Sequence, residues 1–321
     1  MEPMSNAEGP PGIGLDIGAT KTLGVVIDAE GHIQDQVREP TELGAEGVVR
    51  TAARVVERLR ERSGHELSGP VGVGVPGLVD VERGAVKHAV NLDIDGDWMQ
   101  LRDLLADRLG SRVYVENDVN AATLGAMALT GERDLVYLSI GTGLAAGMVL
   151  EGRLRRGLHG AAGEIGHVPV DPSGVLCQCG QRGCLETVAS GSALSAAWPS
   201  PDGPPAVALF AAAAAGDVRA IEVRDRFAAG VASAIRLIGL TIDVQTVVLG
   251  GGVAQLGEPL REAVATALCA QGSASPFLAS LDLADRLQVV PPEHPVSAVG
   301  AALLGRTPAA TQDPGPVRTA G

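Results

Sequence analysis

The apolar residues change their spacing several times along the chain, and each change predicts a different element. Near the start, residues 13–17 and 22–27 are two short apolar runs around a glycine-containing turn, which predicts two strands, and a further turn and strand are expected from Glu30-Gly31. Between 48 and 62 the apolar residues keep the spacing of an amphipathic helix. The run VGVGV at 71–75 predicts a buried strand that ends in a tight Pro-Gly turn.

Helices and strands then alternate, and the order of elements recurs in the second half. A second set of strands is expected to begin at 135–141, and Ala-rich stretches of high helix propensity follow it. The remaining expectations are helices at 100–109, within 206–240, at 258–269 and at 296–304, and strands at 112–116, 246–254 and 287–290. The pattern therefore predicts an α/β protein whose two halves resemble each other in element order.

The composition narrows the class of protein. With 321 residues, two domains are expected rather than one. A formal net charge of -13 argues against a nucleic-acid partner, because phosphate binding needs a basic face. No apolar run reaches the length of a membrane span, and the N-terminus lacks the pattern of a signal peptide. Four cysteines, three of them clustered, suit a reducing cytoplasm better than a disulfide framework.

The segment 163–186, GEIGHVPVDPSGVLCQCGQRGCLE, carries metal-binding chemistry. Three thiolates and one imidazole are a complete tetrahedral ligand set for zinc, and the set here is His167, Cys177, Cys179 and Cys184. Core thiols or a partial disulfide pair are the alternatives. This Gly-rich run, however, can bury little apolar surface and would need a cross-link to hold its fold. Glu164 and Glu186 flank the set, so a folded zinc site would fix both carboxylates. Cys269 lies alone in an apolar helix and is expected to be buried.

Three glycine turns after strands are candidate phosphate cradles. DIGATK at 16–21 combines a glycine turn with an acid that can hold magnesium and a lysine that neutralises charge. IGTGLAAG at 140–147 and GGG at 250–252 follow strong strands, the latter where a helix is expected to begin. The alternative for each is an ordinary turn. Turns of this kind in both halves suggest a nucleotide clamped between two lobes.

VENDVNAA at 115–122 ends a strand with three polar residues. An acid at the carboxyl end of a strand, such as Asp118, is well placed to accept a proton from a substrate hydroxyl. A helix N-cap is an equally good interpretation, because Asp and Asn cap helices and the apolar run AATLGAMAL follows.

Taken together, these motifs resemble those of the ROK family of sugar kinases and repressors. DIGATK, VPGLVD, ENDVNAA, IGTGLAAG, AGEIGHVPV with CQCGQRGCLE, and LGGGV stand in the order and spacing of that family over residues 12–305. The histidine and cysteine signature with its flanking glutamates is the specific part, whereas the glycine turns taken singly are not.

The resemblance implies an actin/hexokinase-like ATPase fold, in which two RNase H-like lobes hold ATP and sugar in the cleft between them, with a zinc-binding insertion. The implied N-terminal lobe covers 12–119 together with the C-terminal helix 296–305. The C-terminal lobe covers 120–295, with the zinc site at 163–186. The Pro- and Gly-rich ends, 1–11 and 306–321, are expected to be a disordered leader and tail.

The resemblance also implies roles for individual residues. Asp118 would be the general base that accepts the proton of the sugar 6-hydroxyl as it attacks the γ-phosphate. His167 would place one ring nitrogen on a structural zinc ion and the other on the sugar, and Asp16 would hold magnesium through water. The implied sugar-binding residues are Gly77, Asn117, Asp118, Glu164, His167 and Glu186. The implied phosphate or nucleotide contacts are Asp16, Gly18, Thr20, Lys21, Gly141, Thr142, Gly143, Gly250, Gly251 and Gly252.

The activity implied in this way is ATP-dependent phosphorylation of the 6-hydroxyl of a hexose, with glucose as the first expectation. A kinase for an amino- or N-acetyl-hexose would share the same contacts, and polyphosphate is an alternative donor. Repressors of the family carry a winged-helix domain ahead of the first lobe, for which the stretch before the first strand is too short. Relatives are usually dimers, so a cytoplasmic homodimer or homotetramer is expected.

Overall fold

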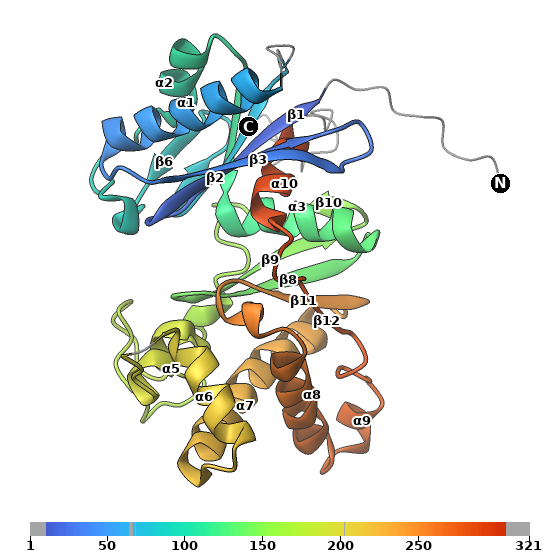
Figure 1. Cartoon of the computed structure of the whole chain (residues 1–321). Coiled ribbons are helices and arrows are strands. Elements are labelled where there is room, and N and C mark those ends of the chain that lie inside the picture. The colour runs from blue at the N-terminus through green and yellow to red at the C-terminus, as the bar shows by residue number, and fades with distance from the viewer. Residues whose placement is uncertain (1–10, 64–66, 68, 202, 306–321) are drawn as a thin grey trace, which may run out of the picture. The chain divides into compact units, whose positions relative to one another are not determined.

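The computed structural model describes residues 11–63, 67, 69–201 and 203–305, which form two compact units (Figure 1). The first unit comprises the described residues within Met1–Arg133, Glu151–Ala162 and Pro295–Gly321, and the second comprises those within Asp134–Leu150 and Gly163–His294. The expected disordered leader, apart from Pro11, and the expected tail lie outside the described residues. In the described part of the chain, no helix has the length and apolar character needed to cross a membrane.

A five-stranded sheet with the order β3-β2-β1-β4-β7 forms the centre of the first unit. β1 pairs with β2, and β2 with β3, in antiparallel fashion, whereas β1, β4 and β7 run parallel. The strands are β1 (Gly12–Ile17), β2 (Lys21–Ile27), β3 (Ile33–Pro40), β4 (Val71–Val75) and β7 (Val113–Asn117), with a hairpin of β5 (Leu78–Asp80) and β6 (Ala85–Lys87) after β4. The unit also contains the two-residue β10 (Arg153–Leu154) and the 3-10 turn η1 (Val90–Leu92).

Alternate residues of β1 decide which helices cover each face of this sheet, because successive side chains of a strand point to opposite faces. Ile13, Leu15 and Ile17 belong to the main core, together with α1 (Ala45–Arg62) and α2 (Leu101–Leu109). Gly14 and Asp16 face the other way, toward α3 (Asp118–Thr130) and α10 (Val296–Leu304), which Figure 1 shows on the opposite face. Asp16 is therefore a polar residue on the face of α10.

The helix α10 approaches the sheet and α3 at positions that lack a side chain. A Cβ added at Gly14 would overlap the backbone of Ala298, and one added at Gly300 would overlap the carbonyl of Ala121. This packing ties α3 firmly to the first unit. The predicted lobe boundary after residue 119 falls inside α3, and the structure instead assigns the whole helix, together with Glu151–Ala162, to the first unit.

The second unit repeats the design of the first. β8 pairs antiparallel with β9 and parallel with β11, which pairs parallel with β12, so the predicted recurrence of element order is confirmed. The strands are β8 (Leu135–Ile140), β9 (Leu144–Leu150), β11 (Thr246–Gly250) and β12 (Leu287–Val289). The helices are α4 (Glu186–Ala189), α5 (Gly191–Ala197), α6 (Pro205–Ala214), α7 (Val218–Thr241), α8 (Glu258–Gly272) and α9 (Pro276–Ala279), with 3-10 turns η2 (Ile165–His167) and η3 (Val253–Leu256).

The core of the second unit lies between this sheet and the long helices α7 and α8. Leu138 and Ile140 of β8 pack in one cluster with Ile235 and Val264 from these two helices. Between η2 and α4, the predicted zinc segment forms neither a helix nor a strand. Two isolated β-bridges, Pro169 to Cys184 and Leu176 to Arg182, hold it. The sequence prediction that this segment is poor in strands is confirmed.

Candidate functional site

Glu116, Asn117 and Asp118, the END motif, turn the chain from β7 into α3, and the N-cap interpretation is confirmed for Asn117. Asn117 is the N-cap, and its Oδ1 accepts hydrogen bonds from the backbone N–H groups of Val119 (2.9 Å) and Asn120 (3.2 Å). Its Nδ2 donates to the carbonyl of Gly77 at 3.1 Å. Asp118 is the first residue of the helix, where the N-terminal dipole favours a carboxylate. The cap therefore fixes the position from which Asp118 extends.

A buried ion pair lies directly behind this turn. Glu116 is only 1% exposed, and its Oε2 accepts hydrogen bonds from Arg156 Nε at 2.7 Å and Nη2 at 2.6 Å. Its Oε1 accepts from the backbone N–H of Asn117 and from the side chain of Asn120, both at 3.0 Å. Sequence reasoning missed this pair. A strand-end Glu among apolar residues signals a partner, but nothing in the sequence identifies a residue 40 positions away.

The DIGATK turn joins β1 to β2 and carries Asp16 at its start. The backbone N–H of Gly18 donates to the carbonyl of Lys21 at 2.9 Å, and Thr41 braces the turn by donating from its hydroxyl to the carbonyl of Gly18 at 2.7 Å. Ser297 of α10 donates to Asp16 Oδ1 at 3.0 Å and lies 3.5 Å from the carbonyl oxygen of Asp118. The first unit thus brings the two predicted acids to either side of one serine hydroxyl.

Burial shifts the pKa of the Asp16 carboxyl. Desolvation raises the pKa of this carboxyl above its usual range, against the opposing effects of the Ser297 hydrogen bond and the Lys21 charge. A cation close to Asp16 would favour the ionised form, so the chemistry of this position fits a magnesium ion held through water. Ser297 and Thr41 were not identified from the sequence, because each lies far along the chain from the turn it supports.

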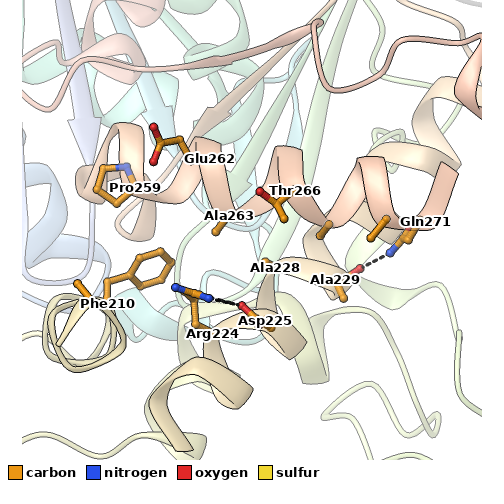
Figure 2. Close-up of a pocket in the computed structure, with 13 residues that line it drawn as sticks. Phe210, Arg224, Asp225, Ala228, Ala229, Pro259, Glu262, Ala263, Thr266 and Gln271 are labelled. Carbon is orange, nitrogen blue, oxygen red and sulfur yellow. Dashed lines mark hydrogen bonds and ion pairs between the residues drawn. The ribbon is translucent and has the colours of Figure 1, made fainter. Parts of the chain in front are cut away.

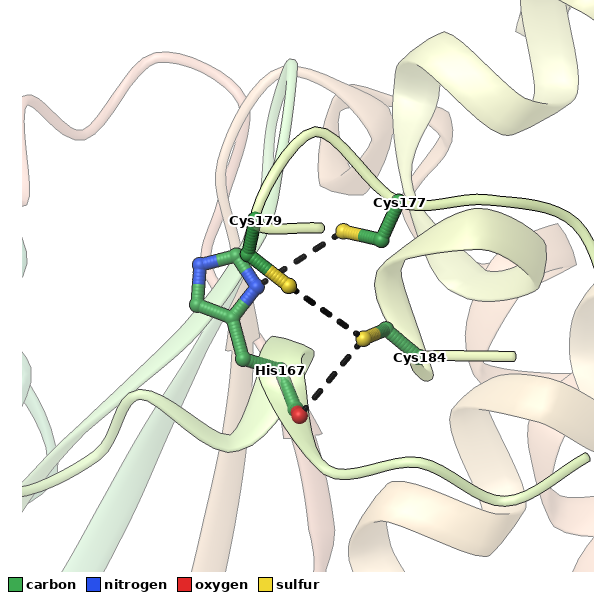
Figure 3. A group of neighbouring side chains, drawn as sticks. All are labelled: His167, Cys177, Cys179 and Cys184. Atoms are coloured by element: carbon green, nitrogen blue, oxygen red, sulfur yellow. Dashed lines mark hydrogen bonds between the residues drawn. The ribbon is translucent and has the colours of Figure 1, made fainter. Parts of the chain in front are cut away.

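In the second unit, the four predicted zinc ligands gather in one place. Figure 3 shows the side chains of His167, Cys177, Cys179 and Cys184 turned toward one another, and their ligand atoms all lie within 4.8 Å of one another. The Sγ atoms of Cys179 and Cys184 are 3.6 Å apart, and Cys177 Sγ is 3.8 Å from His167 Nδ1. A tetrahedral zinc ion with bonds of about 2.3 Å to sulfur separates neighbouring sulfurs by about 3.8 Å. The residues present fit the metal.

The backbone of the segment explains how these ligands meet. The N–H of Cys177 donates to the carbonyl of Gln181 at 2.7 Å, and the N–H of Gly180 donates back to the carbonyl of Cys177 at 2.9 Å, which closes a tight turn around Cys179. Gly180 and Gly183 both have positive φ, a conformation that glycine adopts without steric cost. The sequence CQCGQRGC therefore encodes the turn as well as the ligands.

The thiols of Cys179 and Cys184 differ in acidity. The backbone N–H and then the side-chain amide of Gln181 lower the pKa of the exposed Cys179 to about 6. Burial, and then hydrogen bonding with its neighbouring thiols, raises the pKa of Cys184 to about 12. Because a metal binds the thiolate, its arrival would displace the protons from the more basic thiols.

The predicted sugar-binding groups of this unit surround the thiol cluster. His167 turns Nδ1 toward Cys177, and its Nε2 lies 3.9 Å from Glu164 Oε2, so the two ring nitrogens face different partners. Glu186 Oε2 accepts a hydrogen bond from the backbone N–H of Leu144 at 3.1 Å, and its Oε1 lies 4.0 Å from Cys177 Sγ. A Cβ added at Gly143 would overlap the Glu186 carboxylate. The structure therefore brings Glu164, His167 and Glu186 together with the end of the β8–β9 turn.

The two glycine turns of this unit differ in what their glycines do. In the β8–β9 turn, the backbone N–H groups of Thr142 and Gly143 have no acceptor within the described residues and remain available. In the GGG turn, a Cβ on Gly250 would overlap the Tyr137 ring, so this glycine is required for packing. A Cβ added at Gly252 would meet no atom within 4 Å. The four-residue 3-10 turn η3 follows this glycine, where a helix was expected to begin.

One prediction about the cysteines is wrong. Cys269 was expected to be buried, but it is exposed, because it lies on the outer face of α8 while Leu260, Val264 and Leu268 face the core.

A separate hollow of about 780 Å³ between α6, α7 and α8 is lined mainly by alanines with Phe210, Arg224 and Glu262 (Figure 2). None of the predicted site residues lines it.

Comparison with known proteins supports the motif-based interpretation. A family model described as "ROK family" matches residues 12–306. The chain is 37% identical to a glucokinase of Thermotoga maritima over 78% of this chain and 86% of the relative. It is 32% identical to an N-acetylmannosamine kinase of Yersinia pseudotuberculosis over 75% of this chain and 83% of the relative.

Among solved structures, a ROK family glucokinase from Streptomyces griseus in complex with glucose and AMPPNP has a TM-score of 0.74 and 32% sequence identity. The match covers 92% of this chain and 99% of that one. The predicted α/β fold of the actin/hexokinase type is confirmed by this likeness.

Proposed function

The chain belongs to the ROK family, as its motifs predicted, and on that premise we propose that it transfers the γ-phosphoryl group of ATP to the 6-hydroxyl of a hexose, with glucose as the preferred substrate. The observation that carries the sugar assignment is the arrangement around His167. Its Nδ1 faces the thiol cluster and leaves Nε2, Glu164 and Glu186 available for hydroxyl groups. Carboxylates that accept hydrogen bonds from neighbouring hydroxyls suit a hexose.

Asp118 supplies the chemistry in this proposal. Its carboxylate accepts the proton of the 6-hydroxyl while the sugar oxygen forms a bond to the γ-phosphorus and the bond to the leaving oxygen of ADP breaks. Asn117 holds the turn from which Asp118 projects, through its cap and its hydrogen bond to Gly77. Asn117 and the Gly77 backbone also contact the sugar.

The phosphate groups are assigned to the glycine turns. The free N–H groups of Thr142 and Gly143 donate to phosphate oxygens. The nucleotide or its phosphates also contact Gly18, Thr20 and Lys21 at the β1–β2 turn and Gly250–Gly252 at the end of β11. Asp16 would hold magnesium, and such an ion would neutralise the charge that develops on the phosphates. His167 and the three cysteines would hold zinc, whose role would be structural, because four protein ligands leave no open position.

An assay of sugar 6-phosphate formation tests the activity with either donor, and with ATP the release of ADP follows the same reaction. Glucose, mannose, fructose, glucosamine, N-acetylglucosamine and N-acetylmannosamine are compared with ATP and with polyphosphate as donors. We expect the highest kcat/KM with glucose and ATP. The absence of turnover with every sugar would refute the kinase assignment and favour a sugar-sensing regulator.

The second candidate is a kinase for an N-acetyl- or amino-hexose. The observation that favours it is the 32% identity to an N-acetylmannosamine kinase, although the identity to a glucokinase is higher and extends over more of both chains. The same sugar panel separates the two candidates, since the second predicts a preference for an N-acetylated or amino sugar over glucose.

A further inference from the structure

A second cavity, in the first unit, is lined by arginines. Its volume is about 240 Å³. Arg102 comes from α2, Arg112 precedes β7, and Arg156 follows β10. The other lining residues are Val81, Val113, Tyr114, Val115 and Leu304. No acidic side chain contributes to the lining within the described part of the chain, so the cavity combines a basic rim with an apolar wall.

The arginines retain hydrogen-bond donors after their contacts within the protein are counted. Arg156 uses Nε and Nη2 on Glu116, and Arg102 uses Nε on Asp103 and Nη1 on the carbonyl of Glu82. A guanidinium has five N–H donors, so each keeps some of them unused. The backbone carbonyl of Arg112 accepts a hydrogen bond from the N–H of Val71, but its exposed guanidinium has neither a hydrogen bond nor an ion pair with any described residue.

Charge balance points to an anion. Of the three guanidinium groups, only that of Arg156 is neutralised by a buried carboxylate; the Asp103 partner of Arg102 is exposed, and Arg112 has none. Three cations around one small cavity repel one another, and the repulsion is relieved by an anion that accepts from several of them at once. Phosphate matches this demand, because its oxygens accept the forked donors of arginine.

We propose that this cavity binds a phosphate dianion, either free or as a phosphate monoester. Arg112 and Arg102 hold the anion with the unused N–H groups of Arg156, and the Tyr114 hydroxyl is a further donor. The valines and Leu304 provide an apolar surface on which the organic part of a monoester can rest. The site is separate from the glycine turns assigned to ATP and does not depend on the proposed function.

The cavity is connected to the END motif through hydrogen bonds already described. Arg156 lines it and is bound to Glu116, which accepts from the backbone of Asn117 next to Asp118. An anion in the cavity therefore shares Arg156 with the carboxylate behind the predicted base.

Isothermal titration calorimetry on the full chain tests the proposal with two probes, inorganic phosphate and a hexose 6-phosphate. We expect Arg112→Ala to weaken binding of both probes at this site about tenfold or more, since it removes charge-assisted hydrogen bonds. Arg108→Ala is the matched control, because Arg108 is an exposed arginine of the same unit that does not line the cavity. This variant should bind like the wild type.

The outcomes separate the sources of phosphate and the ways in which the proposal can fail. Tighter binding of the hexose 6-phosphate than of inorganic phosphate would show that the apolar wall contributes, and equal binding would show that phosphate alone is recognised. Unchanged binding in Arg112→Ala, or an equal loss in Arg108→Ala, would overturn the proposal. Tyr114→Phe, which keeps the ring and removes the hydroxyl, supplies a milder variant if Arg112→Ala does not fold, and binding as tight as the wild type would then count against the site.

Discussion

At the scale of single residues, Asp118 is positioned by the contacts of the two residues that precede it in the END motif. Asn117 caps α3 and anchors the turn to Gly77, and Glu116 anchors the same turn to Arg156. Asp118 is thus the first residue of a helix whose first turn is held by two anchors, Gly77 and Arg156. This arrangement suits a group that must meet a substrate hydroxyl at a defined distance.

Asp118→Asn tests the role of the base. The amide has nearly the same shape but accepts no proton, so we expect kcat to fall by about 10²–10⁴, the usual contribution of a general base. Sugar binding, measured by calorimetry without ATP, should persist because the amide still forms hydrogen bonds. A kcat close to that of the wild type would show that the proton goes elsewhere.

Arg156→Ala tests the support behind the base. Glu116 would be left as an unpaired buried carboxylate, which destabilises a protein by about 3–5 kcal/mol. We expect a lower free energy of unfolding in urea and a lower kcat, with KM for ATP little changed. Arg156→Lys, which keeps the charge, should recover part of both losses. Arg108→Ala, at an exposed position of α2, should change neither the free energy of unfolding nor kcat.

The residue scale also shows what the sequence could and could not provide. The gathering of His167 with the three cysteines, and an acid directly after β7, could be predicted because each motif is short and its members fold locally. Arg156, Ser297 and Thr41 were missed, since each acts on a residue 23 or more positions away, through a contact that only the tertiary structure creates. Cys269 was misjudged because an apolar helix has an exposed face as well as a buried one.

At the scale of elements, α10 determines the geometry of the first unit. The helix passes so close to α3 and to the sheet that glycines occupy the contact positions on both sides. Its first turn carries Ser297, which lies between Asp16 and Asp118. The sequence predicted α10 and left α3 as one of two interpretations of 115–122. The contact between the two helices set the extent of the first unit, which is why the predicted boundary at 119 differs from the structure.

Gly300→Ala tests this close packing. The added methyl group would overlap the carbonyl of Ala121 and force α3 and α10 apart, and overpacking of this kind destabilises a protein by about 1–3 kcal/mol. Gly272→Ala in the last turn of α8 is the matched control, since its Cβ would approach nothing closer than 3.7 Å. That change should be neutral or stabilising by up to about 1 kcal/mol. Equal unfolding midpoints for the two variants would contradict the packing argument.

The zinc segment offers a second test at the scale of elements. Cys179→Ser removes one of the four proposed zinc ligands, and we expect loss of bound zinc by elemental analysis. Since His167, Glu164 and Glu186 surround the cluster, KM for the sugar should rise more than KM for ATP. A variant that retains full zinc would show that Cys179 is not a ligand. Equal effects on the two KM values would instead show that the cluster does not specifically support sugar binding.

At the scale of the whole molecule, the chain consists of two units of the same design, each with its own core. Leu15, Val56 and Val73 belong to the core of the first unit, and Leu138, Ile235 and Val264 belong to that of the second. The duplication was readable from the sequence, because strand and helix periods recur in the same order. The oligomeric state stays a prediction, because the interface of a dimer leaves no comparable period in the sequence.

Because the two units have separate cores, we expect loss of zinc to destabilise only the part of the chain around the metal site. The ligands belong to the second unit, where the segment 163–186 contacts β9 and leads into α4, so chelation should raise backbone hydrogen exchange in 163–186 and at the start of β9. The first unit, with Asp118 and the Glu116–Arg156 pair, should keep its protection, because none of its core residues contributes to the cluster. Hydrogen-exchange mass spectrometry with and without a chelator measures both regions in one experiment. A uniform rise across the two units would show that they unfold as one cooperative body and that the metal stabilises the whole chain.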